Sequence, residues 1–449
     1  MRTKKPLAVA VMTLAGVTAS GSTMGNELEA RIAALEAQLA ALKDQVVLQQ
    51  NTIAQQDARI SFDEEMIEEA RPTKKGTKFQ YGGFIQLDTM ATSYGEGKPG
   101  NELIEDFLVA SLIPVEPADG RSDSYSSTNM HAKTSRFYFT TNTPTDHGNL
   151  SSRVELDFIL SNQGDERISN SWSSRVRHAF LKWDYDQNSS ILAGQSWSTF
   201  FNVGALPDVL DFVGPVGTIF NRQPQIRWTS GGLQLAVEAP ATRLNRDAGG
   251  SLSTSFDDFH EGVPDLVARY NGTAGDLNWT VAGIVRELSY EDRSSSAVEE
   301  GSDSQFGYGL SLSGKWALGR NDLRFMANYG DALGRYMGLN AFNDGYVDAN
   351  GDIETIDQWG LTLAYRHMWS DKWNSTFSVS AIAADNPSVG DFALADSLAK
   401  EYQSVHANLS YMPAPGLRFG GELIYATKEL EDGRDGDLSR FQFAAKYAF

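Results

Sequence analysis

Cysteine is absent from this chain of 449 residues. Its absence excludes disulfide scaffolds, zinc–thiolate sites, iron–sulfur clusters and cysteine catalysis. Beyond the N-terminus there is also no apolar run of about 18 residues, and the mean hydropathy is −0.34, which excludes a helical membrane protein. A membrane β-barrel is not excluded, because its alternating strands average out as hydrophilic. Basic residues are few, 38 against 58 acidic ones, and the net charge of −20 argues against nucleic acid as a partner.

The N-terminus has the pattern of an export signal. Arg2, Lys4 and Lys5 precede the apolar stretch 7–17, and the small residues of Val17-Thr18-Ala19 suit signal peptidase. The stretch is too short to span a bilayer. We therefore predict a cleaved signal over 1–19; the alternative is an uncleaved anchor, although no stop-transfer pattern follows.

Residues 26–71 contain neither glycine nor proline, and their apolar residues recur at heptad spacing. This narrow stripe predicts a coiled coil that associates with other copies, followed by a linker over 72–78. The seam alone does not decide between dimer and trimer, and an amphipathic helix packed on its own domain is the alternative. The a positions are Ile32, Leu39, Val46, Ile53 and Ile60, and the d positions are Leu28, Leu35 and Leu42.

After residue 78 the apolar residues alternate with period two, which predicts strands. We count sixteen segments of the length that a tilted membrane strand needs. Residues 79–449 are therefore expected to form a sixteen-stranded antiparallel transmembrane β-barrel, an all-β fold preceded by the α-helical coiled coil. The expected strands are 79–93, 132–143, 149–161, 173–186, 190–199, 222–229, 233–239, 263–271, 277–290, 305–316, 322–331, 356–368, 373–384, 400–411, 416–427 and 438–449.

The connections between these segments alternate in length. The long ones are 94–131, 200–221, 240–262, 291–304, 332–355 and 385–399. Outer-membrane barrels have this arrangement, with tight periplasmic turns and longer extracellular loops. Six of the nine tryptophans lie close to a short turn, which predicts an interfacial girdle at the periplasmic rim. They are Trp183, Trp228, Trp279, Trp316, Trp369 and Trp373.

Parity along the strands separates an apolar face from a charged one. In 149–161, Leu150 and Val154 share one face while Arg153, Glu155 and Asp157 share the other. Apolar residues toward lipid and charged residues toward water are typical of a membrane barrel. The terminal Phe449, with Tyr447 two residues before it, looks like the assembly signal of outer-membrane proteins.

Arginine is frequent on the predicted lumen face. Because guanidinium is permanently charged and holds carboxylates bidentately, these positions suit a pathway for small anionic solutes. The alternative is that they only neutralise inward carboxylates at Asp88, Glu155, Asp157, Glu238 and Glu422. Acidic residues such as Glu105 and Asp106 are frequent in the long connections and are expected outside the lumen. The lumen arginines are Arg136, Arg153, Arg177, Arg227, Arg269, Arg324, Arg366, Arg418 and Arg440; Arg177 is left open because the alternation blurs near 175–178.

The connection 200–221 is apolar and glycine-rich, with Val209, Leu210 and Phe212 among its residues. A solvated loop should not have this composition, so we expect it to fold into the barrel as a constriction. Asp208 and Asp211 would then face Arg222 and Arg227 across the narrowing.

Enzymatic and metal motifs are incomplete. Residues 309–315 fit a phosphate-binding loop, but Trp316 replaces the required Ser or Thr and the segment alternates as a strand. Residues 348–354 lack the final Glu of a calcium loop, so an ordinary Asn-Gly turn is expected, with calcium binding left open. We expect no catalytic residue, no metal site and no cofactor. A structural tether or a barrel-scaffold enzyme that uses the coiled coil for periplasmic contacts remains the alternative function.

The combined features resemble the DcaP-like trimeric outer-membrane porins over essentially the whole chain. The resemblance includes 81–88, Ser135-Arg136-Phe137, 194–200 and the terminal Tyr447-Ala448-Phe449. It implies a homotrimer in outer-membrane lipid and lipopolysaccharide with a periplasmic coiled coil. It also implies passive, somewhat anion-selective diffusion of small carboxylate-bearing solutes such as dicarboxylates.

Overall fold

The structure is a computed structural model that describes residues 76–120, 123–159, 164–165, 169–247, 252–253, 262–292 and 301–449. The predicted signal, the predicted coiled coil and residues 72–75 of the linker lie outside the described residues. Within the described ranges, no helix is long and apolar enough to cross a membrane.

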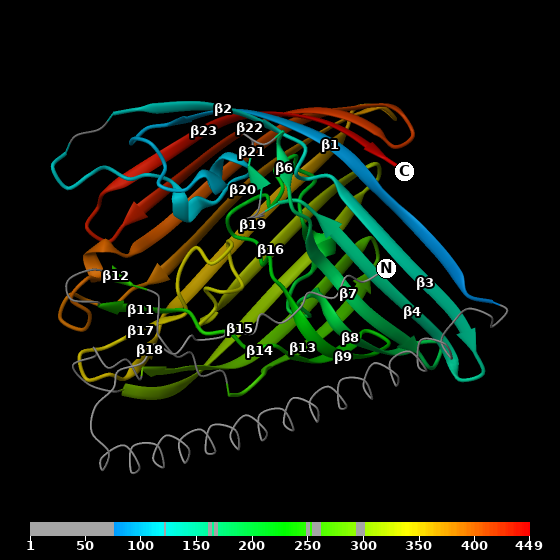
Figure 1. Cartoon of the computed structure of the whole chain (residues 1–449), viewed down its shortest axis with the longest axis horizontal. Helices are drawn as coiled ribbons and strands as arrows, with labels where there is room; N and C mark the ends of the chain where they lie inside the picture. The colour runs from blue at the N-terminus through cyan, green and yellow to red at the C-terminus, as the bar shows by residue number, and fades with distance from the viewer. Residues whose placement is uncertain are drawn as a thin grey trace, which may run out of the picture. The chain divides into compact units, whose positions relative to one another are not determined.

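The described chain forms a closed antiparallel β-barrel (Figure 1). Its first strand, β1 (Lys78–Tyr94), pairs on one side with the last strand, β23 (Asp435–Ala448), which closes the wall. On the other side β1 pairs with two strands in succession. Residues 78–84 of β1 pair with β3 (Arg136–Thr145), and residues 88–94 pair with β2 (Tyr125–His131). The seventeen strands of the sheet therefore make sixteen positions in the wall.

The other wall strands follow in chain order, each paired with its neighbours. They are β4 (Gly148–Asp157), β7 (Arg175–Asp184), β8 (Ser189–Trp197), β9 (Arg222–Ser230), β10 (Leu233–Glu238), β13 (Asp265–Ala274), β14 (Leu277–Asp292), β15 (Gly301–Leu318), β16 (Asn321–Asp331), β19 (Asp357–Met368), β20 (Trp373–Asp385), β21 (Ala399–Ala414) and β22 (Leu417–Leu430). The sixteen predicted segments each overlap one wall position, so that prediction is confirmed. Residues 125–131 were wrongly placed in the connection 94–131, because they form β2.

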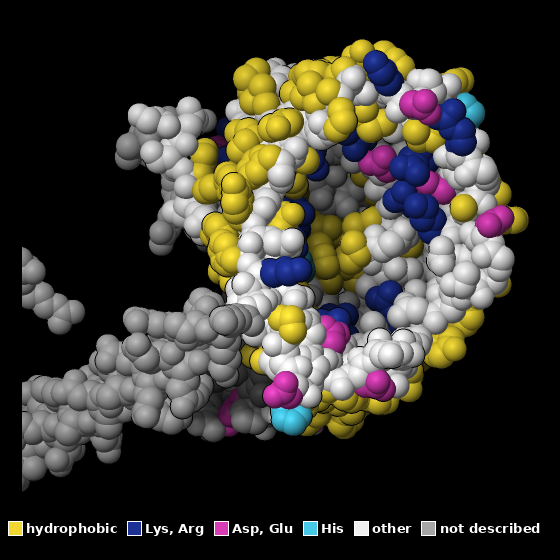
Figure 2. All heavy atoms as spheres, turned by 90° about the vertical axis from the view of Figure 1, so that its right-hand side faces the viewer, with side chains coloured by type: hydrophobic (Ala, Val, Ile, Leu, Met, Phe, Trp, Pro, Cys, Tyr) yellow, Lys and Arg dark blue, Asp and Glu magenta, His cyan; other side chains and the backbone are white. Residues whose placement is uncertain are grey.

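The alternation of side chains explains why these segments form a barrel wall. In β19, Trp359, Leu361 and Leu363 are exposed on the outside, while the residues between them are buried. Figure 2 shows hydrophobic side chains on the outer surface and Lys and Arg around the central hollow. Five of the six predicted girdle tryptophans are exposed, and Trp279 is half-buried against Tyr270.

Short elements occupy the long connections. They are η1 (Glu102–Glu105), η2 (Ala110–Leu112), β5 (Gly164–Asp165), β6 (Ser171–Trp172), η3 (Val203–Ala205), β11 (Leu244–Asp247), β12 (Leu252–Ser253), β17 (Gly345–Val347), β18 (Ile353–Thr355) and η4 (Ala395–Ser397). Three connections contribute to one apolar cluster with lumen-facing wall residues such as Ile424. Phe107 comes from the first, Phe200 and Val216 from the constriction segment, and Tyr336 from the connection after β16.

The inward folding of the first connection corrects one expectation. Asp106 was expected on the outside, but it is 8% exposed and forms an ion pair with Lys133 at 2.8 Å. Glu105 accepts a hydrogen bond from Tyr94 at 2.8 Å. The apolar residues 107–110 of this connection are buried, and they draw their acidic neighbours in with them.

The connection after β16 is fixed to the wall by buried charges. Arg286, whose side chain is fully buried, lies 2.7 Å from Asp344 of the connection and 3.6 Å from Asp265 of β13. Tyr336 donates its hydroxyl to Asp265, and burial raises the pKa of this phenol well above its ordinary value.

Candidate functional site

The segment between β8 and β9 crosses the lumen to the opposite wall. Leu210 donates its backbone N–H to Glu422 of β22 at 2.6 Å, and Gly217 donates to Ser380 of β20 at 2.7 Å. Asn328 of β16 donates to the carbonyl oxygen of Gly217 at 3.1 Å. β8 and β9 are the fifth and sixth wall positions, whereas these partners lie on the eleventh to fifteenth. The predicted inward folding of this constriction segment is therefore confirmed.

The partners predicted for its two aspartates are wrong. Asp208 contacts Arg418 at 2.9 Å and Arg366 at 3.7 Å, both on the far wall. Asp211 accepts backbone N–H groups from Leu108, Val213 and Gly214 at 2.8 to 3.0 Å. No ion pair joins Asp208 or Asp211 to Arg222 or Arg227 within the described residues.

A first group of arginines surrounds two carboxylates on β4. Glu155 lies 2.5 Å from Arg153, 2.9 Å from Arg177 and 3.4 Å from Arg136. Asp157 lies 2.6 Å from both Arg175 and Arg177. Among the described residues, four guanidinium groups thus share these two carboxylates, an excess of two positive charges. Arg175 was missed because a register shift between Glu155 and Leu156 interrupts the parity where β4 meets β7.

A second group lies on the far wall near the short turns. Asp322 contacts Arg366 at 2.6 Å, Arg324 at 2.7 Å and Lys315 at 3.7 Å. With Arg418 and Asp208 this makes four cations for two carboxylates, again an excess of two. Asp322 and Lys315 did not figure among the predicted site residues, although both have the lumen parity of their strands.

Besides Arg440, three of the predicted arginines have no ion pair with a carboxylate among the residues that the structure describes. Arg269 donates to the carbonyl oxygen of Phe201 at 2.7 Å, and Arg227 donates to that of Trp197 at 3.3 Å. The guanidinium carbon of Arg222 lies 4.7 Å from the centroid of the Trp197 ring. Neutralisation by carboxylates therefore balances only part of the positive charge in the first two groups. It balances none of the charge of Arg222, Arg227 and Arg269 through an ion pair within the described residues.

Arg440 is buried and is bonded to an uncharged side chain and a backbone carbonyl group. It is 2% exposed, donates to Thr92 at 2.8 Å and also donates to the carbonyl oxygen of Ile104. These contacts fix the first connection to β23. Its guanidinium is thus engaged by the protein itself.

Nothing in the described ranges forms a group of three or more His, Asp or Glu side chains that could hold a metal ion. Asp348 is the first residue of the turn for which calcium was left open. It accepts backbone N–H groups from Asn350 at 2.8 Å and Asp352 at 2.9 Å. Hydrogen bonds from Asp352 and Asn350 hold the pKa of the Asp348 carboxyl below its ordinary value. The carboxylate of Asp348 thus closes a turn over residues 348–352.

A sixteen-position barrel with an apolar outside, a charged lumen and a segment folded across it defines a channel of the porin type in the outer membrane. The chain belongs to the DcaP outer membrane protein family, whose profile matches residues 11–449. This membership is what the terminal phenylalanine, the strand pattern and the quoted stretches imply.

The chain is similar to solved structures of outer-membrane proteins. The outer membrane channel DcaP of Acinetobacter baumannii is 22% identical, with a TM-score of 0.66 over 84% of this chain and 99% of that one. An anion-selective porin from Comamonas acidovorans is 10% identical, with a TM-score of 0.48 over 83% of this chain and 100% of that one. OmpF of Salmonella typhi in complex with daunomycin is 10% identical, with a TM-score of 0.49 over 83% of this chain and 98% of that one. No curated protein matches the chain.

Proposed function

We propose that this protein lets small carboxylate-bearing anions diffuse passively across the outer membrane. One observation carries the proposal: Arg222, Arg227 and Arg269 project from the near wall and form no ion pair with a carboxylate among the described residues. The two arginine groups, each with an excess of two positive charges, add to the same potential. An anion that enters this lumen meets permanent positive charge on both walls, although the chain as a whole is acidic.

Charge of this kind favours anions without binding them tightly. Conduction requires interactions strong enough to admit a solute and weak enough to release it. Guanidinium groups already held by carbonyl oxygens keep free N–H donors and do not need to reorganise when an anion passes. The barrel therefore offers several shallow sites.

Solute flux into liposomes tests the proposal directly. Purified protein should admit acetate, succinate and similar carboxylates faster than ammonium ions of matched size. Equal rates, or faster entry of the cations, would contradict it. Liposomes with heat-denatured protein give the leak rate to subtract.

We further propose that the protein is a homotrimer whose N-terminal helix lies in the periplasm. One part of the wall supports contact between copies: β8 and β9 have nine residues each and β10 has six, against 16 in β14 and 18 in β15. A strand needs about 9–11 tilted residues to cross the apolar band of a bilayer. β10 falls short of this length and β8 and β9 only just reach it, so this part of the wall is the better place for contact between copies.

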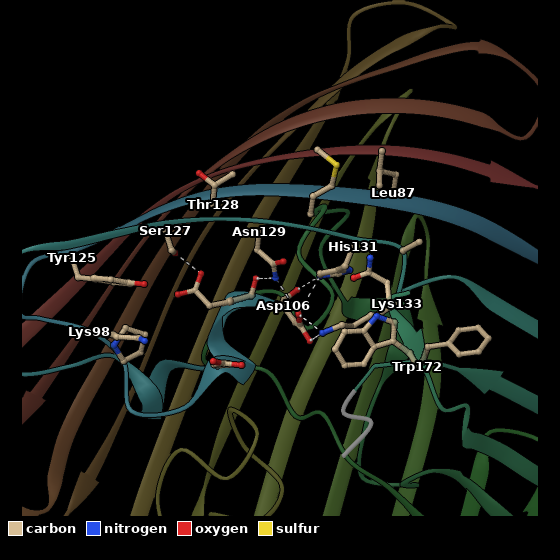
Figure 3. A pocket seen from close by; sticks show the side chains of 17 residues that line it. Leu87, Lys98, Asp106, Tyr125, Ser127, Thr128, Asn129, His131, Lys133 and Trp172 are labelled. Atoms are coloured by element: carbon tan, nitrogen blue, oxygen red, sulfur yellow. Dashed lines mark hydrogen bonds and ion pairs between the residues drawn. The ribbon is translucent and has the colours of Figure 1, made fainter. Parts of the chain in front are cut away.

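An opening beside β2 supports the same proposal. Within the described chain β2 is paired only with β1, so one backbone edge is free. A cavity of about 1150 Å³ lies along that edge and is lined both by exposed Met130 and by buried Asp106. Figure 3 shows Asp106, His131, Lys133 and Trp172 gathered at this opening. Unpaired backbone and charged groups are costly in lipid, so a neighbouring copy is the better cover.

Mass measurement of the protein in native-like detergent tests the oligomeric state. A trimer is expected, and a monomer at all protein concentrations would contradict it. Disulfide crosslinking tests where the copies touch. A cysteine in place of Met130 on β2 is expected to crosslink two copies, whereas a cysteine in place of Leu361 on β19 should give no crosslink.

A further inference from the structure

A second, smaller cavity lies inside the barrel between the wall and the constriction segment. Its volume is about 140 Å³, and its lining includes Phe84, Arg136, Arg418 and Lys446 from the wall and Leu210 and Phe212 from the segment. It combines three cationic side chains with apolar surfaces. The lining residues come from β1, β3, β22 and β23, which meet where the barrel closes.

Lys446 is the unusual member of this cavity. Its ammonium lies 3.7 Å from the centroid of the Phe84 ring, and the guanidinium carbon of Arg136 lies 5.2 Å from the same centroid. Lys446 is only half-exposed, and the described part of the chain provides no hydrogen-bond acceptor or ion-pair partner for its three N–H donors. Two cations thus lie against one aromatic ring, with the ammonium uncompensated.

Nearby carboxylates are engaged elsewhere. Asp211 lines the cavity but accepts three backbone N–H groups, as described above. Asp88 accepts hydrogen bonds from Gln86 at 2.8 Å, from Gln442 at 3.1 Å and from Thr134. Arg418 differs from Lys446 because Asp208 and Ser410 already hold its guanidinium.

We propose that this cavity binds the carboxylate group of a small organic anion, with Lys446 and Arg136 as its ligands. The Nε of Arg136 lies 3.4 Å from Glu155, a carboxylate that Arg153 and Arg177 contact more closely. The terminal N–H groups of Arg136 can therefore be presented to a planar carboxylate. Phe84, Leu210 and Phe212 would contact the short apolar body of the solute. The inference rests on the proposed function, since it names a binding site on the pathway of the anions.

Fluorine NMR of 4,4,4-trifluorobutyrate with the purified full-length protein measures this binding without requiring conduction. Line broadening by the wild-type protein is expected, and trifluorobutyramide, the neutral match, should not broaden. Lys446→Met should weaken binding of the carboxylate roughly tenfold, the effect of losing one charge-assisted contact of about 1.4 kcal/mol. Lys446→Arg should keep most of it. Lys400→Met is the control, because Lys400 lies on the exposed surface and pairs with Glu429 at 2.8 Å.

The outcomes separate the site from the channel function. Equal broadening by the amide, or equal affinities of the Lys446→Met and Lys400→Met proteins, would overturn the binding site. If the wild-type protein still prefers anions in flux experiments, the proposed function stands without it. Should Lys446→Met fail to fold, as judged by heat-dependent gel mobility, Lys446→Gln takes its place, and the comparison of acid with amide on the wild type decides in any case.

Discussion

Glu422 of β22 accepts the backbone N–H of Leu210 at 2.6 Å, from a segment that starts on the other side of the barrel. The same carboxylate lies 2.9 Å from Nδ1 of His406 and 3.1 Å from Nδ2 of Asn408, and it is fully buried. A buried acceptor with three donors of fixed position holds the constriction segment against the far wall.

Removal of this carboxylate should loosen the constriction. In Glu422→Ala the N–H of Leu210 and the side chains of His406 and Asn408 lose their acceptor, at a cost of about 1–3 kcal/mol. We expect larger and noisier single-channel currents in planar bilayers. Glu429→Ala is the control on the same strand, because Glu429 pairs with Lys400 on the exposed surface at 2.8 Å. Identical current traces for the two variants would show that Glu422 does not hold the segment.

The arginines without carboxylate partners should set selectivity. A unit charge about 6 Å from a passing ion contributes about 0.7 kcal/mol in a water-like dielectric, which is about threefold in permeability. Arg227→Gln and Arg269→Gln should each lower the chloride-to-potassium permeability ratio by about this factor. Arg320→Gln, at an exposed turn, should leave the ratio unchanged. Reversal potentials measure the ratio, and no change in either lumen variant would count against the account.

Two ion pairs should differ widely in their importance for stability. Arg286→Met leaves Asp344 buried without its cation and leaves Asp265 with Arg335 at 3.5 Å, which costs about 3–5 kcal/mol. Arg320→Met removes an exposed partner of Asp371, worth about 0–1 kcal/mol. We expect a lower thermal midpoint and faster proteolysis within 332–356 for the first variant only. Equal midpoints would contradict the role assigned to Arg286.

Barrel closure should depend on Gly83. Its N–H donates to the carbonyl oxygen of Phe449 at 3.2 Å, and its own carbonyl oxygen accepts from Phe449 at 3.1 Å. A Cβ at Gly83 would lie 2.1 Å from the carbonyl oxygen of Arg136, whereas one at Gly421 would lie 3.4 Å from its nearest neighbour. Gly83→Ala should therefore reduce the fraction of heat-modifiable, folded barrel, and Gly421→Ala should not. Equal folding yields would show that the wall relaxes around the methyl group.

Deletion of 26–71 separates the channel from a structural tether. The barrel strands do not include these residues, so the shortened protein should still fold and conduct. Loss of conduction from a barrel that is still heat-modifiable would favour the tether. The mass of the shortened protein also tests whether the helix is needed for trimers.

Local patterns sufficed to predict the wall. Period-two alternation gave the sixteen positions, and apolar composition identified the inward-folded segment at Val209, Leu210 and Phe212. The same signal at 107–110 was overlooked because acidic neighbours dominate that connection. β2 was missed because its residues are polar and it ends after seven.

Partners across the lumen could not be predicted in the same way. Parity states which side of the wall a residue faces, but the pairing of Asp208 with Arg418 joins residues 210 positions apart. The division of arginines into paired and unpaired ones depends on such contacts. A register shift likewise hid Arg175, since one extra residue reverses the parity that follows.

The reversal potential of the wild-type channel in a potassium chloride gradient tests the central claim most directly. The account predicts chloride preference that weakens as salt rises, because the lumen charges are then screened. Channels that prefer potassium, or the absence of channels from correctly folded protein, would contradict it.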